Sequence, residues 1–239
     1  MLQERLTSLP SMPAASILRS APGIEVARVE SLPFGEHSYI CRREGAQDCV
    51  VVDPGFEPEA IVAWIESQGL APRAILLTHG HSDHIAGNGF LKARWPDLPI
   101  VVGRDEAFKL GDPASNLSAA FGLALTSPPA DRLVADGERL SEAGLDMVVR
   151  KIPGHSVGHI VYVLDGESPP LVFGGDVLFR EGIGRTDFPD GDFGDLAAGI
   201  RTHLYALPPE TIVFPGHGEP TTVAHERRHN PFVPGLMAD

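Results

Sequence analysis

The chain has 239 residues, enough for one large domain or two small ones and for a core that needs no disulfide. Its 19 Lys and Arg against 32 Asp and Glu give a formal net charge of −13. Such acidity argues against the clustered cations that bind phosphates, so we expect neither nucleic acid nor an anionic membrane as a partner. The two Cys, Cys41 and Cys49, are too few for a thiolate metal site, whereas the ten His stand out.

The start of the chain shows no targeting segment. Glu4, Arg5 and Arg19 interrupt the first twenty residues, and no apolar run approaches the roughly 20 residues that span a bilayer. We therefore expect a cytoplasmic protein. We also expect residues 1–239 to form a single domain, with an N-terminal extension over 1–22 and a short C-terminal tail over 218–239.

Strands and helices are predicted to alternate along the whole chain. Apolar runs bounded by turn residues predict strands at 24–29, 38–41, 48–53, 74–77 and 100–102, a β-rich stretch over 133–179, and a last strand at 211–214. Apolar residues at helical spacing predict helices at 58–69, 85–95 and 193–207, and a short helix around 117–121 within a loop over 112–129. This interleaving favours one layered α/β domain.

One local pattern occurs four times: a short apolar strand enters a turn that delivers polar residues. The strand-and-turn pairs are 75–77 with 78–84, 148–152 with 153–155, 171–173 with 174–176, and 212–214 with 215–217. If the carboxyl ends of these strands lie at one edge, all the polar residues meet there, which is where sheet-based α/β folds build their sites.

The polar residues of these turns are types that bind metals. In extended backbone, His79, His81 and Asp83 would point to the same side. Imidazole and carboxylate ligands suit divalent transition metals, zinc first, and one metal needs three or four of them. Seven candidates fit two metals that share one carboxylate better than a single metal. The candidate ligands are His79, His81, Asp83, His84, His155, Asp176 and His217.

Two alternatives compete with a catalytic metal pair. Residues 154–158 match the G-x-S-x-G nucleophile elbow around Ser156, and Asp176 and His217 follow in the order of a Ser-Asp-His triad. The elbow requires a helix after the serine, whereas the β-branched residues 160–164 predict a strand. The second alternative is a metal-binding scaffold without catalysis, but structural zinc sites are usually closed and rich in cysteine.

The ordered motifs resemble the metallo-β-lactamase superfamily. Four segments look like its successive metal-binding motifs: Thr-His-Gly-His-Ser-Asp-His (78–84), Pro-Gly-His (153–155), Gly-Gly-Asp (174–176) and Pro-Gly-His (215–217). A fifth segment, Val-Val-Asp-Pro-Gly (51–55), looks like the strand and turn that precede them. The resemblance implies an αββα sandwich of two mixed sheets with helices outside. It also implies a first metal on His79, His81 and His155, a second metal on Asp83, His84 and His217, and Asp176 as the bridge.

Within this superfamily, the chain is most similar to short bacterial relatives of glyoxalase II, the hydroxyacylglutathione hydrolases. They share Gly-Arg-Thr-Asp-Phe-Pro (184–189) and Arg-His-Asn-Pro-Phe (228–232). Glyoxalase II proper binds glutathione through a basic residue, matched here by Arg185, and through a Tyr where this chain has Asp187. Glyoxalase II proper also has a Tyr soon after its last ligand, whereas residues 218–219 of this chain contain none. Arg185 would bind a substrate carboxylate or, alternatively, pair with Asp187 or Asp190.

These features together predict a binuclear metal-dependent hydrolase. A metal-bridging hydroxide would attack a thioester or related ester, S-lactoylglutathione being one candidate, with Asp83 and Asp176 as catalytic residues. The expected cofactors are two divalent metal ions, Zn²⁺ first and Fe or Mn as alternatives, and the expected partner is a small anionic thioester. Residues 182–188 are also similar to persulfide dioxygenases, which bind a single iron, so an oxidoreductase is the alternative function. The histidines outside the motifs are predicted to pack or to lie at the surface, with His37 and His159 lining the cleft.

Overall fold

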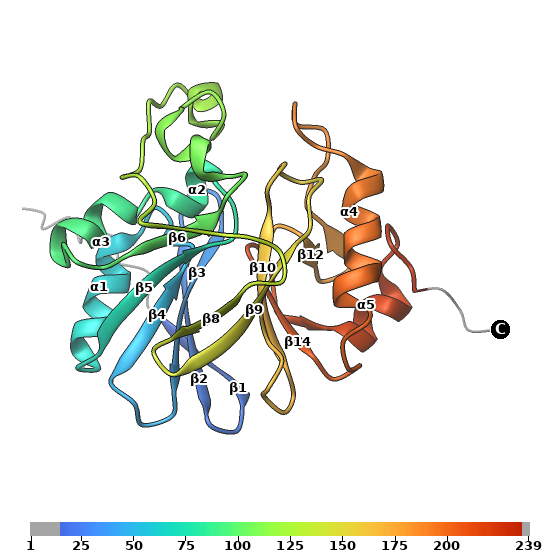
Figure 1. Ribbon diagram of the computed structural model, residues 1–239, viewed down its shortest axis with the longest axis horizontal. Helices are drawn as coiled ribbons and strands as arrows, with labels where there is room; N and C mark the ends of the chain where they lie inside the picture. Colours follow the sequence, from blue (N-terminus) through green and yellow to red (C-terminus); the bar gives the residue numbers. More distant parts are fainter. Residues whose placement is uncertain (1–14, 236–239) are drawn as a thin grey trace, which may run out of the picture.

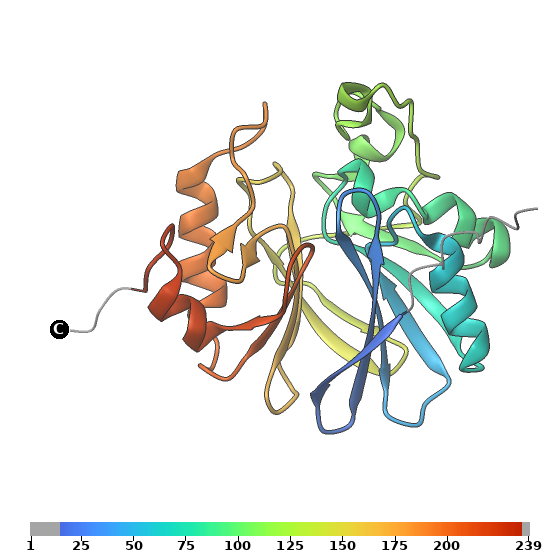
Figure 2. The ribbon, with the colours of Figure 1, turned by 180° about the vertical axis from the view of Figure 1, so that it is seen from behind.

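Two mixed β-sheets pack face to face in this computed structural model, and helices cover the outer face of each sheet (Figure 1). The structure describes residues 15–235. Seen from behind, the first half of the chain forms one sheet with its helices and the second half forms the other (Figure 2). This arrangement is the predicted αββα sandwich, so the predicted fold class is confirmed.

The first sheet has seven strands, and their order in the sheet follows the chain. The strands are β1 (Ser16–Ala21), β2 (Ile24–Ser31), β3 (Glu36–Arg43), β4 (Asp48–Val52), β5 (Ala71–Leu77), β6 (Ile100–Gly103) and β7 (Arg132–Val134). Strands β1 to β4 form an antiparallel meander, and β4 to β7 run parallel to one another. Part of the predicted N-terminal extension is therefore the edge strand β1, and residues 1–14 lie outside the described part.

The second sheet has six strands, in the order β15-β14-β11-β10-β9-β8. Its strands are β8 (Arg139–Glu142), β9 (Leu145–Lys151), β10 (Ile160–Leu164), β11 (Leu171–Gly175), β14 (Ile212–Pro215) and β15 (Thr221–Thr222), beside a separate ribbon of β12 (Leu178–Phe179) and β13 (Gly182–Ile183). Strand β14 is parallel to β11, and β10 is antiparallel to both β11 and β9. Strands β9, β11 and β14 therefore all end on the same side.

The helices are short. They are α1 (Pro58–Ser67), α2 (Ser82–Ile85), α3 (Asn88–Arg94), α4 (Phe193–Gly199) and α5 (Val223–His229), with 3-10 turns η1 (Ala107–Gly111) and η2 (Ser118–Phe121) and a π-helical turn η3 (Ile200–Leu204) that continues α4. Helices α1 and α3 cover the first sheet, and α4 and α5 cover the second (Figure 1). The prediction that the last strand lies at 211–214 was wrong, because β15 and α5 follow it.

The single helix predicted over 85–95 is in fact two helices. The chain breaks at Gly87, whose N–H donates to Pro54 O at 2.8 Å instead of to a carbonyl of α2. A Cβ at Gly87 would lie 2.8 Å from Gly55 O, so only glycine permits this close approach. Helix α2 begins at Ser82, so Asp83 is helical and does not continue the alternation that extended backbone would give to His79, His81 and Asp83.

Three apolar clusters form the core: one between the two sheets and one between each sheet and its helices. Two buried tyrosines join the sheets across the central cluster. The hydroxyl of Tyr39 on β3 donates to Pro215 O at 2.6 Å, and that of Tyr162 on β10 donates to Leu77 O at 3.0 Å. Both acceptors lie at the ends of strands that lead into predicted ligands. The two sheets are thus fixed relative to each other where the candidate site lies.

Cys41 and Cys49 are both fully buried free thiols. Cys41 belongs to the cluster between the sheets, whereas Cys49 belongs to the cluster beneath α1, so the two face opposite sides of the first sheet. Within residues 15–235, no helix is both long and apolar enough to cross a membrane.

Candidate metal centre

All seven predicted ligands lie together at one end of the sandwich. The turn after β5 carries His79 and His81, and α2 carries Asp83 and His84. The remaining three follow the ends of β9, β11 and β14 in the second sheet. Each sheet therefore supplies part of the cluster, as the repeated strand-and-turn pattern predicts.

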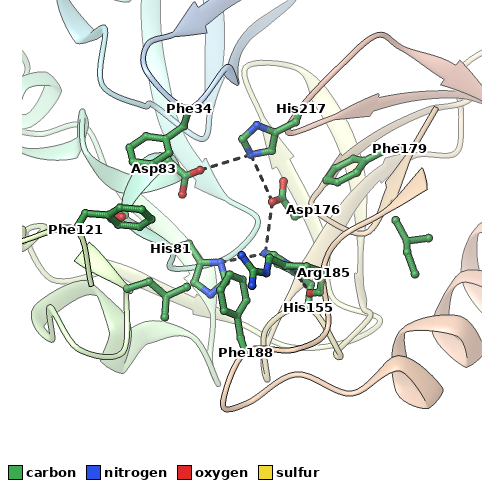
Figure 3. Close-up of a pocket in the computed structure, with 13 residues that line it drawn as sticks. Phe34, His81, Asp83, Phe121, His155, Asp176, Phe179, Arg185, Phe188 and His217 are labelled. Atoms are coloured by element: carbon green, nitrogen blue, oxygen red, sulfur yellow. Dashed lines mark hydrogen bonds and ion pairs between the residues drawn. The ribbon is translucent and has the colours of Figure 1, made fainter. Parts of the chain in front are cut away.

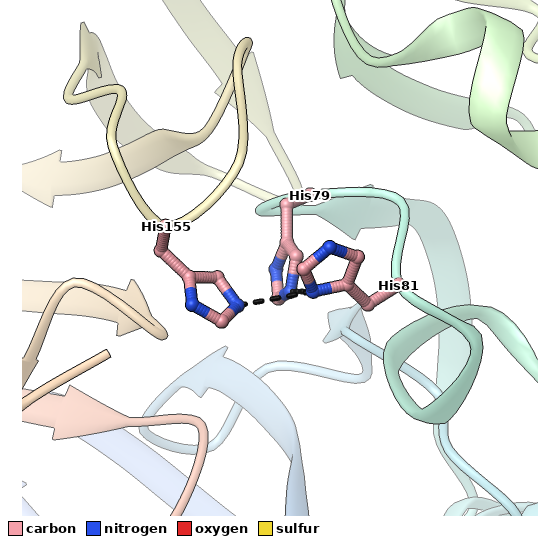
Figure 4. A group of neighbouring side chains, drawn as sticks. All are labelled: His79, His81 and His155. Carbon is pink, nitrogen blue, oxygen red and sulfur yellow. Dashed lines mark hydrogen bonds between the residues drawn. The ribbon is translucent and has the colours of Figure 1, made fainter. Parts of the chain in front are cut away.

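Three imidazoles form the first donor group, and their ring nitrogens point toward one another (Figure 4). The Nε2 atoms of His79 and His155 each lie 3.0 Å from His81 Nδ1. Two nitrogen ligands on a tetrahedral zinc are separated by about 3.3 Å, given Zn–N bonds of about 2.0–2.1 Å. The group thus has the composition and spacing of a three-histidine metal site.

The second donor group consists of Asp83, His84 and His217. His217 Nε2 lies 3.5 Å from Asp83 Oδ2, and His84 Nε2 lies 3.9 Å from the same oxygen. Asp176 lies between the two groups (Figure 3): its Oδ2 is 3.4 Å from His155 Nε2 and 3.5 Å from His217 Nε2. One carboxylate therefore reaches both groups, which is the position a bridging ligand would take.

The buried polar atoms of this cluster fit a pair of cations. His84 Nε2 and Asp176 Oδ1 are buried, have no hydrogen-bond partner and lie 3.4 Å apart. The outer ring nitrogens of two ligands, in contrast, are engaged: His155 Nδ1 donates to Arg185 O at 2.9 Å, and His217 Nδ1 donates to Gly35 O at 3.2 Å. Such outer contacts fix the ring orientation and leave the inner nitrogen free to ligate.

Two glycines permit the close packing around Asp176. A Cβ at Gly216 would lie 2.2 Å from Asp176 Oδ1, and a Cβ at Gly184 would lie 1.9 Å from Asp176 O. A side chain at Gly216 would displace the carboxylate from its place between the two groups, and a side chain at Gly184 would displace the backbone of Asp176. This gives a steric reason for the glycines of Gly-Arg-Thr (184–186) and of Pro-Gly-His (215–217).

The protonation states of the first donor group and of Asp176 also suit a cation. Burial, reinforced by the neighbouring histidines, holds the pKa of His79 well below its usual value. Burial would raise the pKa of Asp176, but His84 and His217 outweigh it and lower that pKa well below its usual range. Burial would likewise lower the pKa of His217, but Asp176 and Asp83 raise it to about 10. The first group therefore offers neutral imidazoles, and Asp176 offers a charged carboxylate.

Asp53 is a functional candidate that the sequence analysis did not assign to the site. It directly follows β4, and its carboxylate accepts hydrogen bonds from Thr78 N at 2.7 Å and Thr78 Oγ1 at 2.6 Å. His84 Nδ1 lies 3.1 Å from Asp53 Oδ2. The sequence pattern could have identified Asp53, because it is another polar residue in a turn that directly follows an apolar strand.

A second missed feature is a buried network around Glu106. Its carboxylate accepts hydrogen bonds from Gly80 N at 2.9 Å, from Gly158 N at 2.7 Å and from Ser156 Oγ. Lys109 Nζ lies 3.7 Å from Glu106 Oε2 and also donates to Ser156 Oγ. The network joins the turn that carries His79 and His81 to the turn that carries His155.

The same network excludes Ser156 as an elbow nucleophile. The serine is fully buried, and its hydroxyl donates a hydrogen bond to Glu106 and accepts one from Lys109. The segment that follows is strand β10 and not a helix.

The prediction that His37 and His159 line the cleft was also wrong. Both are buried outside the cavity wall, and His159 Nε2 accepts a hydrogen bond from Asp176 N at 3.1 Å.

A cavity of about 370 Å³ opens beside the cluster (Figure 3). Five predicted ligands reach its wall: His81, Asp83, His155, Asp176 and His217. Arg185 also lines it, with its guanidinium donating to both carboxylate oxygens of Asp187 at 2.7 and 2.6 Å. Of the two partners considered for this Arg, the structure shows Asp187, while Asp190 binds Lys109 at 2.6 Å.

Two packed mixed sheets with His and Asp groups at their strand ends define a metal-binding αββα protein. Residues 33–217 match the model of the metallo-beta-lactamase superfamily. The chain therefore belongs to the metallo-beta-lactamase superfamily, a superfamily of metallo-hydrolases, as its motifs predicted.

Curated relatives carry similar descriptions. The chain is 38% identical over 189 residues to "Probable metallo-hydrolase YqgX" of Bacillus subtilis, covering 79% of this chain and 88% of that protein. It is 37% identical over 193 residues to "Hydroxyacylglutathione hydrolase GloC" of Haemophilus influenzae, covering 78% of this chain and 88% of that protein.

Solved structures agree with this assignment. BLEG-1 B3 metallo-beta-lactamase superposes with a TM-score of 0.82 at 35% identity, covering 87% of this chain and 99% of that one. TTHA1623 in a di-iron-bound form gives a TM-score of 0.74 at 39% identity, with 86% and 98% covered. ETHE1 from Myxococcus xanthus gives 0.71 at 28% identity, with 87% and 84% covered.

Proposed function

We propose that this chain hydrolyses thioesters or related esters with two divalent metals. The observation that carries the proposal is the position of Asp176, within 3.5 Å of donors from both groups and at the wall of an open cavity. The similarity of the chain to a hydroxyacylglutathione hydrolase supports thioester cleavage as the reaction.

Each donor group would hold one of the two metals. His79, His81 and His155 would hold one metal. Asp83, His84 and His217 would hold the other, and Asp176 would contact both. When bound, the metals supply a water of lowered pKa and Lewis-acid polarisation of a carbonyl. Zinc is the first expectation, with iron next because a di-iron relative exists.

The side chains of the cavity wall would position the reacting groups and accept a proton from water. Asp83, partly exposed to the cavity, can orient a water through Oδ2 and accept its proton. His81 and His155 line the same wall, and the apolar side chains beside them would limit access of bulk water. Ser156 takes no part, because its hydroxyl is buried in the Glu106 network.

Metal content measured together with turnover tests the proposal. Two zinc or iron equivalents per chain with hydrolysis of S-lactoylglutathione or a simpler thioester would support it. One iron with oxygen uptake on a persulfide would establish the dioxygenase alternative instead. Full metal loading without turnover of any thioester, ester or lactone would favour a scaffold.

The variant Asp176→Ala tests the bridging role. We expect it to lose one metal equivalent and to lower kcat by at least about a hundredfold, as loss of a ligand does. Asp195→Ala, in the first turn of α4, is a matched control that should keep both metals. Full activity in the Asp176 variant would refute the two-metal mechanism.

A further inference from the structure

Six apolar side chains line the cavity, and they come from the turn between β2 and β3, the η2 segment, the ribbon of β12 and β13, and the loop before α4. They are Phe34, Leu117, Phe121, Phe179, Ile183 and Phe188. Phe34, in the turn between β2 and β3, meets Phe121 of η2 nearly edge-on, with ring centroids 5.1 Å apart and an interplanar angle of 71°. Phe121 is 61% exposed, so an aromatic face of this pair is available to a ligand (Figure 3).

Within residues 15–235, the cavity wall holds a single Lys or Arg that could meet an anionic substrate. This residue is Arg185, and Asp187 offsets its charge with two hydrogen bonds. The Arg185 guanidinium also stacks over Phe188, 4.4 Å from the ring centroid. The chain as a whole carries a formal charge of −13, which repels anions at longer range.

We propose that the preferred substrate is an uncharged thioester or ester with an apolar acyl chain, and not a glutathione thioester. The inference rests on the proposed hydrolytic function. The scissile carbonyl would face the His and Asp cluster, and the acyl chain would lie against the pair of Phe34 and Phe121. The sequence alone favoured an anionic substrate met by Arg185, but the geometry engages that guanidinium with Asp187.

A series of N-acetylcysteamine thioesters tests the proposal on the metal-loaded enzyme. Acetyl, butyryl and hexanoyl esters share one uncharged thiol and differ only in chain length. We expect kcat/KM to rise about threefold per added methylene, as apolar burial dictates, and to exceed that of S-lactoylglutathione. A flat series, with S-lactoylglutathione as the better substrate, would overturn the proposal and leave the hydrolase function intact.

Two variants test whether the dependence of kcat/KM on acyl chain length arises at Phe121. Phe121→Ala should lower kcat/KM for the hexanoyl ester about fivefold to tenfold more than for the acetyl ester. Phe90→Ala is the matched control, because Phe90 is another exposed Phe but lies on α3 and outside the cavity wall. Equal losses on both esters in the Phe121 variant would contradict an acyl-binding role.

The charge argument has its own test. Asp187→Asn removes the partner of Arg185, so kcat/KM for S-lactoylglutathione should rise about threefold to fivefold relative to that for the butyryl ester. An unchanged ratio would show that the ion pair does not set the preference.

A binding measurement separates this inference from the hydrolytic function. If no thioester is turned over, the hydrolase proposal fails, and calorimetry with the uncleavable thioethers N-acetyl-S-hexylcysteamine and S-hexylglutathione still decides the inference. Tighter binding of the neutral thioether, weakened by Phe121→Ala, would support an apolar, uncharged ligand. Tighter binding of S-hexylglutathione would overturn it.

Discussion

Asp53 Oδ2 lies 3.1 Å from Nδ1 of His84, and the same carboxylate accepts two hydrogen bonds from Thr78. Thr78 Oγ1 in turn lies 3.1 Å from His79 Nδ1. One carboxylate at the end of β4 therefore orients a histidine in each donor group. It acts behind both groups without lining the cavity.

The first prediction concerns this orienting carboxylate. Asp53→Asn should weaken metal binding about tenfold to a hundredfold, because loss of an outer partner loosens the ligand rings. Competition with a chromophoric chelator measures the affinity. Asp131→Asn is the control: Asp131 also accepts a backbone N–H, that of Ile100, but its side-chain partner is Lys92 and not a candidate ligand. Equal affinities in the two variants would contradict the orienting role.

The second prediction concerns the buried Glu106 network. Glu106→Gln should lower the free energy of unfolding by about 3 kcal/mol, because it removes the buried negative charge beside Lys109. Urea denaturation measures this loss. The exposed pair of Glu138 and Arg132 provides the comparison, and Glu138→Gln should cost less than about 1 kcal/mol. A loss as small in the Glu106 variant would show that the network contributes little to stability.

Metal removal gives the third prediction. A ligand that binds only the folded chain stabilises it, by about 2.7 kcal/mol at a hundred times its Kd. We therefore expect a chelator to lower Tm by about 5–10 °C, with recovery on adding zinc. The shift should be smaller in Asp176→Asn, which loses the shared carboxylate. Identical Tm values with and without chelator would argue against tight metal binding by the native protein.

The fourth prediction concerns the two thiols. Burial raises the pKa of Cys49 to about 12 and raises that of Cys41 further. Because the thiolate is the reactive form, neither should react with a disulfide reagent at pH 8 until the chain unfolds. Both should then react at once in guanidinium chloride. Rapid labelling of the native protein would contradict the burial of these residues.

The sequence predicted the central strands well because their cause is local, whereas it missed the edge strands β1 and β15. Runs such as Ile75 to Leu77 and Val172 to Phe173 are apolar and end at glycine or polar turns, so pattern and structure agree. The break between α2 and α3 could not be predicted in this way. It depends on the approach of Gly87 to Pro54, a contact between segments 33 positions apart.

The candidate ligands were visible for a related reason: each follows a strand, and together they form a dense cluster of metal-binding types. Glu106 and Lys109 carry no such signal, because an isolated acid and base in a loop are usually solvated. Their role arises only when the fold places Gly80 and Ser156 beside them. The ion pair of Arg185 with Asp187 was foreseen as one alternative, but the choice between partners required the geometry.

The hydroxyls of Tyr39 and Tyr162 cross between the sheets just before the strand ends that supply His217 and His79. Neither donor group is complete within one sheet, because His155 joins the first group and Asp83 and His84 join His217. A growing chain therefore cannot assemble the first donor group until His155 has been synthesised, or the second until His217 has been synthesised, and the two sheets must then dock. A polypeptide interrupted before residue 217 would lack the second donor group.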